Sequence, residues 1–424
     1  MTTQETTFSK ICLSEQPEQN NSLQETLKIG FEALKIFPPF YAQSMLGSAI
    51  HWLPPYREYS EFTVLNPWKP LTTLQYLGDI SIPAFSHAPN KWARTFIPPL
   101  VTDVFWRPSG YHQQMDPFDS ETSFIREKWF FINGIGTNET LAQINSNLIS
   151  QMFRRPVTII NNSTNSIPLD VCQCFIGYQV KNDPSIDKPK TMTEPVGVAI
   201  VALIEALVDP EVDNIVLINH SQGTIITGNV LRALGNALHT LEKLEANPSS
   251  TDVMALDILD QLALEKLPDL NHPHIEEAGG VLNYALKILT KLEVYTFANC
   301  ASEMTYLAYL EKEDGERIGL PYIENIANKN DIIARIGVLS PLRGQDGEND
   351  PITIDGPVFE RKKDVTFMDT WGHLLNHCYL YAISDYLNDM ENITNPFPSQ
   401  TNGDQSKPRL YGYFAGQRQS SYLK

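Results

Sequence analysis

The stretch NIVLINHSQGTII, residues 214–226, runs from apolar residues into a polar triplet, Asn219-His220-Ser221, and becomes apolar again after Gly223. Its first half has the composition of a buried strand, and the residues after Gly223 have the spacing of a helix. The sequence therefore predicts a strand that ends at a small hydroxyl residue and turns at once into a helix. Such a turn holds the Ser221 hydroxyl clear of its neighbours, at the positive end of the following helix.

Strands and helices alternate on both sides of this stretch. The patterns predict strands at 128–135, 156–162, 292–300, 322–328 and 364–370, and helices at 139–153, 196–208, 224–238 and 372–387. This alternation is typical of parallel strands covered by helices on both faces. The fold class predicted from the sequence is therefore α/β, with a mostly parallel central sheet.

The remaining segments suggest how the chain is divided. We expect a disordered N-terminus over 1–24, an irregular helical, Pro-rich layer over 25–120, the α/β domain over 121–390 and a flexible tail over 391–424. Residues 236–290 are mostly helical and interrupt the alternation. They predict an insertion that acts as a lid or pocket wall, and ordinary packing of its Leu- and Ile-rich faces is the alternative.

The amino-acid composition limits which binding partners and which cellular compartment we expect for the protein. The chain has 424 residues, and 32 Lys+Arg against 50 Asp+Glu give a net charge of −18, which argues against nucleic acid and anionic membranes as partners. The five Cys form no disulfide framework, and Cys172 and Cys174 are interpreted as two thiols on one face of a strand. We find no pattern of a signal peptide, a transit peptide or a membrane span. We therefore expect a cytoplasmic protein, with room for transient contact between an apolar patch and a lipid surface.

The strand, the His220-Ser221-Gln222-Gly223 turn and the helix together resemble the nucleophile elbow of the α/β-hydrolase superfamily, particularly its lipases and esterases. The G-x-S-x-G pattern places small residues two before and two after the nucleophile. Gly223 matches the second position, whereas the bulkier Asn219 stands at the first. The resemblance covers about 125–390, roughly two-thirds of the chain. It implies an α/β-hydrolase fold with Ser221 as nucleophile; the alternative is that Ser221 only caps a helix.

The resemblance also selects the base. In this superfamily the chain order is Ser, then Asp or Glu, then His. Of the nine His, only His373 and His377 follow the candidate acid strands. His373 stands at a strand–helix junction, from which a base can reach the serine, and is our first choice. His377 lies one turn further into the helix and remains the alternative.

The same order places the acid in the loop after the strand at 322–328. Asp331 lies in that polar loop and would orient the histidine. The alternative is that Asp331 is a surface residue that caps the next segment. Glu303, after the preceding strand, is the reserve candidate, and Asp369 is too close to His373 in sequence to be preferred.

An oxyanion hole needs two backbone N–H groups that point at one atom. Gln222 follows the nucleophile and would supply the first. The loop FFINGIGTN, residues 130–138, would supply the second from Ile135 or Gly134, because its glycines permit a close approach. Neither a G-x-G-x-x-G nor a G-x-x-x-x-G-K-[ST] pattern is present, which argues against a nucleotide-binding loop.

Together these residues predict a serine hydrolase that cleaves small-molecule or lipid esters through a Ser-His-Asp triad and an acyl-enzyme. No cofactor or metal is implied. A lipase, phospholipase or thioesterase fits the pattern, and acyl transfer to another acceptor uses the same site. The rival from another class is a binding module that keeps the elbow shape without catalysis.

Overall fold

The structure, a computed structural model, describes residues 8–14, 56–66, 68–81, 112–115, 126–134, 136–162, 190–248, 256–267, 275–313, 315–343, 352–361, 372–400, 407–419 and 421–423. Its centre is a seven-stranded sheet in the order β12-β10-β6-β5-β3-β4-β2. The bounds in that order are Val358–Arg361, Tyr322–Asn328, Leu292–Phe297, Asn214–His220, Glu127–Ile132, Val157–Ile160 and His112–Met115. All neighbours are parallel except β2, which pairs antiparallel with β4. The predicted mostly parallel sheet is confirmed.

The order of the strands creates a branch point between β3 and β5. These two strands are neighbours, but the chain continues from β3 outward to β4 and from β5 outward to β6, on the other side. The loops that leave their carboxyl ends therefore diverge. In open α/β sheets, ligands bind in the crevice at such a point.

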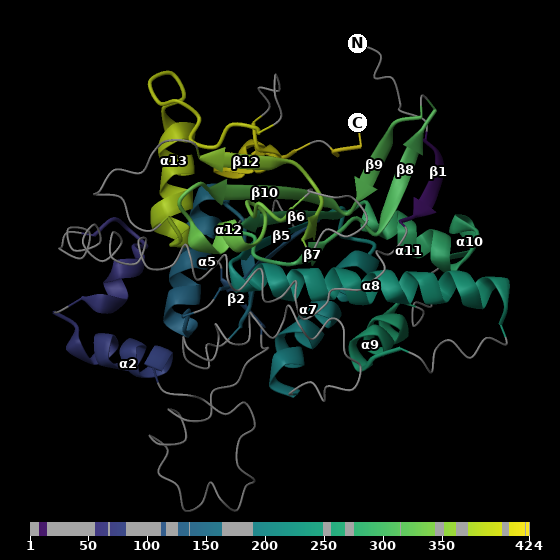
Figure 1. Ribbon diagram of the computed structural model, residues 1–424, viewed down its shortest axis with the longest axis horizontal. Helices are drawn as coiled ribbons and strands as arrows, with labels where there is room; N and C mark the ends of the chain where they lie inside the picture. The colour runs from purple at the N-terminus through teal and green to yellow at the C-terminus, as the bar shows by residue number, and fades with distance from the viewer. Residues whose placement is uncertain are drawn as a thin grey trace, which may run out of the picture.

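Helices cover the two faces of the sheet. Because the β3–β4 and β5–β6 connections run in opposite directions, right-handed crossovers place α5 (Glu139–Phe153) and α8 (Gln222–Ala246) on opposite faces. The helices α7 (Lys190–Val208) and α9 (Ile258–Lys266) pack with α8 in the lower half of Figure 1. A π-helix, η3 (Leu375–Leu380), continues into α13 (Tyr381–Asn388) and packs against α5. Among the helices in the described ranges, none is both long and apolar enough to cross a bilayer.

The described helices of 236–290 extend the layer around α8. Asp257 and Asp260, at the start of α9, bind Arg232 in the middle of α8. The helices α10 (Ile275–Ala278) and α11 (Val281–Leu289) lie further along, where Glu245 accepts from the Leu282 N–H. These contacts lie in the middle of α8 and near its carboxyl end, whereas Ser221 precedes its first residue. These helices fit the ordinary-packing alternative, and they give the predicted lid no support.

A smaller sheet contains the first strand of the chain. β1 (Phe8–Leu13) pairs antiparallel with β8 (Ala308–Lys312), which pairs with β9 (Arg317–Leu320), at the upper right of Figure 1. A short parallel pair joins β7 (Glu303–Met304) to β11 (Thr353–Ile354). The predicted disorder over 1–24 is therefore wrong for β1. Its backbone partners come from a distant part of the sequence, which local composition does not reveal.

Parts of the N-terminal layer pack against the main domain. The 3-10 helix η1 (Glu61–Leu65) contacts α5, and α2 (Pro70–Ser81) follows η1. Tyr76 of α2 donates a hydrogen bond to the Gly136 carbonyl, in the loop after β3. β2, from the end of this layer, is the edge strand of the main sheet. The layer predicted over 25–120 therefore contributes both to the sheet and to the surroundings of that loop.

The C-terminal segment is part of the core. Phe397, Leu410 and Tyr413 are buried, and η4 (Arg409–Gly416) contains the last two. Arg409 forms an ion pair with the buried Glu293 of β6 at 3.0 Å. The predicted flexible tail over 391–424 is wrong for these residues. Its Pro, Gly and polar residues suggest disorder, but its aromatic side chains bury enough apolar surface to order it.

The packing of Phe397 yields a stability prediction. Its ring is fully buried and stacks on Tyr379 with 5.7 Å between the centroids. We expect Phe397→Ala to lower the free energy of unfolding by about 3–5 kcal/mol, measured by urea denaturation. Ile393→Ala, at an exposed position four residues earlier, is the control and should cost about 1 kcal/mol or less. Equal losses of unfolding free energy for the two variants would contradict the packing of the C-terminal segment into the core.

Candidate active site

Ser221 occupies a strained turn between a strand and a helix. β5 ends at His220, α8 begins at Gln222, and Ser221 between them has φ 55° and ψ −125°. A positive φ is uncommon for a residue other than glycine, and strain of this kind costs roughly 1–3 kcal/mol. The surrounding structure must impose it. The predicted strand–turn–helix geometry is present, and Ser221 Oγ is buried without a hydrogen bond in the described part of the chain.

Two glycines make room for this turn. A Cβ on Gly134 would lie 2.6 Å from Ser221 Cβ, and a Cβ on Gly223 would lie 2.4 Å from the Ile132 carbonyl oxygen. Both distances are shorter than side-chain contacts allow. The loop after β3 and the start of α8 therefore meet backbone to backbone, as predicted for Gly134.

Asn219 fills the position where the elbow pattern expects a small residue. Its side chain is fully buried, and neither amide atom has a hydrogen bond among the described residues. In register it lies beside Ile132 of β3 and Thr296 of β6. A buried unpaired amide costs roughly 1–3 kcal/mol, so this departure from the pattern carries a penalty in stability.

His373 and Asp331, which are 42 positions apart in sequence, come together at the carboxyl ends of the strands. His373 Nδ1 lies 3.0 Å from both carboxylate oxygens of Asp331. Tyr379 donates a hydrogen bond to Oδ2 at 2.7 Å, and the Ile333 N–H donates to Oδ1 at 2.8 Å. Asp331 is fully buried. Its carboxylate is therefore fixed in position by several donors.

Asp331 has two structural roles at once. It caps α12 (Ile332–Ile336), as the alternative interpretation proposed, but it is buried and not on the surface. Gly372, just before His373, has φ 80°, and a Cβ there would lie 3.2 Å from the Asp331 amide nitrogen. The close approach of Gly372 brings the histidine against the carboxylate.

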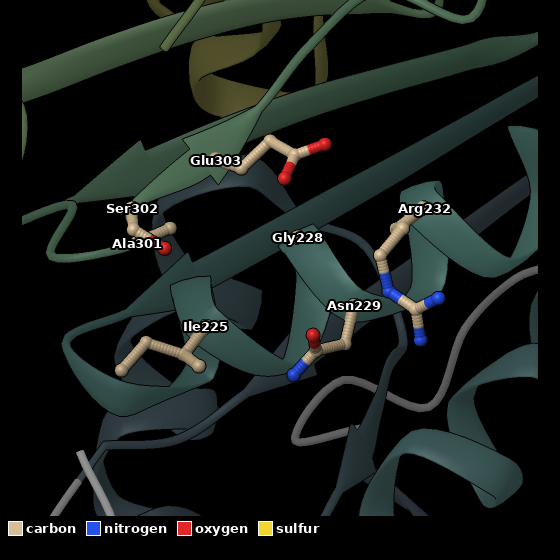
Figure 2. Close-up of a pocket in the computed structure, with 7 residues that line it drawn as sticks. All are labelled: Ile225, Gly228, Asn229, Arg232, Ala301, Ser302 and Glu303. Atoms are coloured by element: carbon tan, nitrogen blue, oxygen red, sulfur yellow. The ribbon is translucent and has the colours of Figure 1, made fainter. Parts of the chain in front are cut away.

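The alternative candidates lie elsewhere. The His377 ring packs edge-on against Phe62 of η1, with 5.3 Å between the centroids. Glu303 lines a pocket beside α8 together with Asn229 and Arg232 (Figure 2). The described contacts pair the base candidate His373 with the acid candidate Asp331.

Several predicted features lie outside the described residues. They are Ile135, Asp369, the strand at 364–370 and the two thiols Cys172 and Cys174. The described strand that precedes His373 is β12, which pairs parallel with β10. Of the two candidates for the second oxyanion donor, the structure therefore places Gly134 alone.

A chain of amide groups joins the two loops that would form the oxyanion hole. Asn133 accepts a hydrogen bond from the Asn162 N–H and donates from Nδ2 to the Asn162 carbonyl, both at 2.8 Å. Asn162 Nδ2 then donates to Gln222 Oε1 at 2.7 Å. These contacts fix the loop after β3 against the first residue of α8. The sequence does contain a signal for this network, because an Asn follows each of β3 and β4, at positions 133 and 162.

Glu61 connects the N-terminal layer to the segment after His373. It is buried and accepts hydrogen bonds from the backbone N–H groups of Asn376 and His377, at 3.2 and 3.1 Å. Burial raises the pKa of Glu61 to about 7, and the two N–H donors offset part of that rise. No local motif marks a carboxylate whose partners lie more than 300 positions away, so the sequence did not reveal it.

Ser221, His373 and Asp331 are the residue types that nucleophilic catalysis requires. His373 Nδ1 lies on a carboxylate, and in this arrangement the other ring nitrogen of a histidine transfers the proton. Ser221 Oγ and His373 are not hydrogen-bonded here, and such contacts often tighten only when substrate binds. Backbone N–H groups of the first turn of a helix have no partner within the helix, so Gln222 can offer one to an anion. Among the described residues, no three His, Cys, Asp or Glu side chains converge as a metal site requires.

Comparison of the chain with protein-family models, with curated proteins and with solved structures gives no match. The fold and the geometry define an α/β protein with a serine, a histidine and an aspartate at the carboxyl ends of a mostly parallel sheet.

The buried carboxyl of Glu61 predicts a pH dependence. Because its pKa is raised from 4.5 to about 7, the folded chain binds more protons than the unfolded chain between these values. The stability from protonated Glu61 is complete below pH 4.5 and is lost as the pH rises through about 7. Between about pH 5 and about pH 8, wild type should lose up to roughly 3 kcal/mol of unfolding free energy relative to Glu61→Gln.

Urea denaturation at both pH values measures this difference. Glu58→Gln, at an exposed position three residues earlier, is the matched control and should keep the pH dependence of wild type. If the free energy of unfolding depends on pH in the same way for wild type and for Glu61→Gln, the role given to this carboxyl is wrong.

Proposed function

We propose that the protein is a serine hydrolase of the α/β-hydrolase type that cleaves carboxylic esters. The observation that carries this proposal is the strained Ser221 turn at the same sheet edge as His373 and Asp331. Ser221, Asp331 and His373 follow β5, β10 and β12, so their chain order is the Ser-Asp-His order of this superfamily. The branch point between β3 and β5 lies at the same place, where an open α/β sheet binds its ligand.

The proposed reaction has two stages. Ser221 Oγ attacks the ester carbonyl while His373 accepts its proton, and Asp331 stabilises the resulting imidazolium. The Gln222 N–H and an N–H of the loop at Gly134 stabilise the negative oxygen. The alkoxide leaves with the proton from His373, which gives an acyl-enzyme. Water, deprotonated by His373, then releases the acid and restores Ser221.

The surroundings favour an apolar acyl group. Cys300 and Ile336 are buried in a small apolar cluster, with Ile225 and Ile333 packed against it. Ile225 lies one turn after Ser221, and Ile333 follows Asp331 by two positions. Esters with an aliphatic acyl chain, including lipid esters, are therefore the proposed substrate class.

A binding module is the second candidate. The bulky Asn219 and the missing hydrogen bond between Ser221 and His373 are the two observations that fit this candidate. A thioesterase or an acyltransferase would use the same acyl-enzyme as the proposed hydrolase. Activation of Ser221 separates the enzymes from the binding module.

Reaction with a fluorophosphonate measures this activation directly. We expect wild type to be labelled at Ser221 and Ser221→Ala to remain unlabelled. Asp331→Asn should lower the labelling rate by roughly 10³–10⁴-fold, because the histidine loses its orienting carboxylate. His373→Gln should lower it to a similar extent.

His377→Gln is the matched control, because its ring packs on Phe62. It should be labelled at the rate of wild type. If folded wild type is not labelled, or if His377→Gln fails while His373→Gln reacts normally, the proposed set of residues is wrong.

A further inference from the structure

The proposed reaction makes no use of His220, although this residue directly precedes Ser221. His220 is the last residue of β5, and its side chain is buried. Successive side chains of a strand point to opposite faces, so His220 lies on the face opposite Asn219. On its own face the ring packs edge-on against Tyr379, with 6.3 Å between the centroids.

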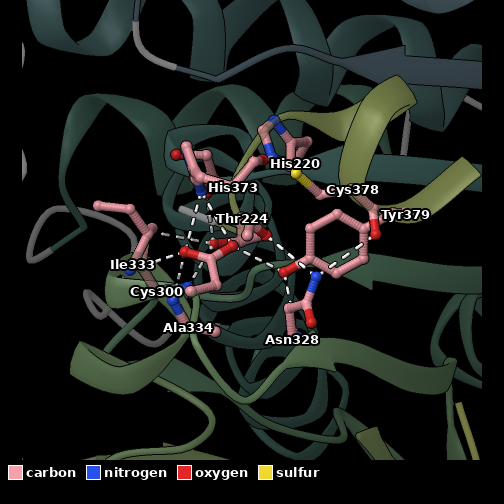
Figure 3. Close-up of polar contacts among 12 residues, drawn as sticks. His220, Thr224, Cys300, Asn328, Ile333, Ala334, His373, Cys378 and Tyr379 are labelled. Carbon is pink, nitrogen blue, oxygen red and sulfur yellow. Dashed lines mark hydrogen bonds and ion pairs between the residues drawn. The ribbon is translucent and has the colours of Figure 1, made fainter. Parts of the chain in front are cut away.

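The polar contact of His220 is with the main chain of His373. His220 Nε2 lies 2.8 Å from the His373 carbonyl oxygen (Figure 3). Because a carbonyl oxygen only accepts, Nε2 must carry the proton. Burial, together with the nearby His373, lowers the pKa of His220 well below its usual value, so the ring is neutral and Nδ1 has no proton. A Cβ on Gly134 would lie 3.2 Å from this Nδ1.

His373 is therefore held at two points by different elements. Its side chain is bound to Asp331 through Nδ1, and its carbonyl is bound to His220. The centroids of the two imidazole rings lie 4.7 Å apart, and the ring planes are tilted by 32°. A hydrogen bond to the side chain alone leaves the backbone of a loop residue free to shift. The carbonyl contact removes that freedom and couples the loop of His373 to the strand that carries Ser221.

We propose that His220 is a positioning residue, whose Nε2–H fixes the backbone of His373 so that the base faces Ser221. This inference rests on the proposed hydrolase function, since it assigns a task within that reaction. His220 itself is buried, and its assigned task is to hold the main chain of His373. Losing its donor should therefore slow the activation of Ser221 without changing substrate binding.

Two substitutions separate the donor from the ring. His220→Phe keeps a flat ring and removes the N–H, whereas His220→Gln keeps an N–H donor. We expect His220→Phe to lower the fluorophosphonate labelling rate roughly 10- to 100-fold, the effect of a small misplacement of a catalytic group. With an ester substrate, kcat should fall in parallel while KM is unchanged. His220→Gln should recover most of the rate.

His239→Phe is the matched control, because His239 Nε2 also binds a main-chain carbonyl, that of Ser14 at 3.1 Å, but lies far along α8. It should be labelled like wild type. If His220→Phe does not fold, His220→Leu serves as the donor-free variant.

A second measurement separates failure of this inference from failure of the proposed function. The proton on His373 Nδ1, bound to Asp331, gives a downfield proton NMR signal that needs no substrate. We expect this signal to shift or broaden in His220→Phe and to return in His220→Gln. Wild type that is not labelled but shows this pattern would overturn the hydrolase and keep the positioning role. Labelled wild type with equal rates for His220→Phe and His220→Gln would overturn the positioning role alone.

Discussion

The close approach of the Gly134 backbone to the Ser221 side chain is the constraint on which the rest of this structure depends. It lies between β3 and β5, where the chain leaves two neighbouring parallel strands in opposite directions. A methyl group on Gly134 would lie 2.6 Å from Ser221 Cβ, so any larger residue would separate the two loops. The strain in the Ser221 backbone and the unpaired amide of Asn219 are held in place by the buried strands on either side.

A second set of contacts fixes the histidine from several directions. Asp331 holds the His373 side chain, and Tyr379 in turn holds Asp331 while it stacks on Phe397 of the C-terminal segment. Glu61 of the N-terminal layer holds the backbone just after His373. Segments from both ends of the chain thus support one short loop. This arrangement gives the irregular N-terminal layer a physical task that its composition did not suggest.

The sequence predicted the parts of the molecule that local pattern controls. The apolar run before Ser221 and the helical spacing after it placed β5 and α8, and the Gly-rich loop placed the close approach at Gly134. The site partners Tyr379 and Glu61 could not be found in this way, because they act on residues far away in sequence and have no motif of their own. The same holds for β1 and for Phe397, whose order comes from tertiary contacts that override local composition. The chain order Ser221, Asp331, His373 came from resemblance, and the contact of the last two is what the structure adds.

The central claim is that Ser221 becomes covalently acylated. The most direct measurement is to mix the protein with an activated short-chain ester, quench in acid and locate the acyl group by peptide mass spectrometry. We expect an acyl group on Ser221 that disappears with time at neutral pH as water releases it. An unmodified Ser221, or an acyl group only on other residues, would show that Ser221 is not the nucleophile.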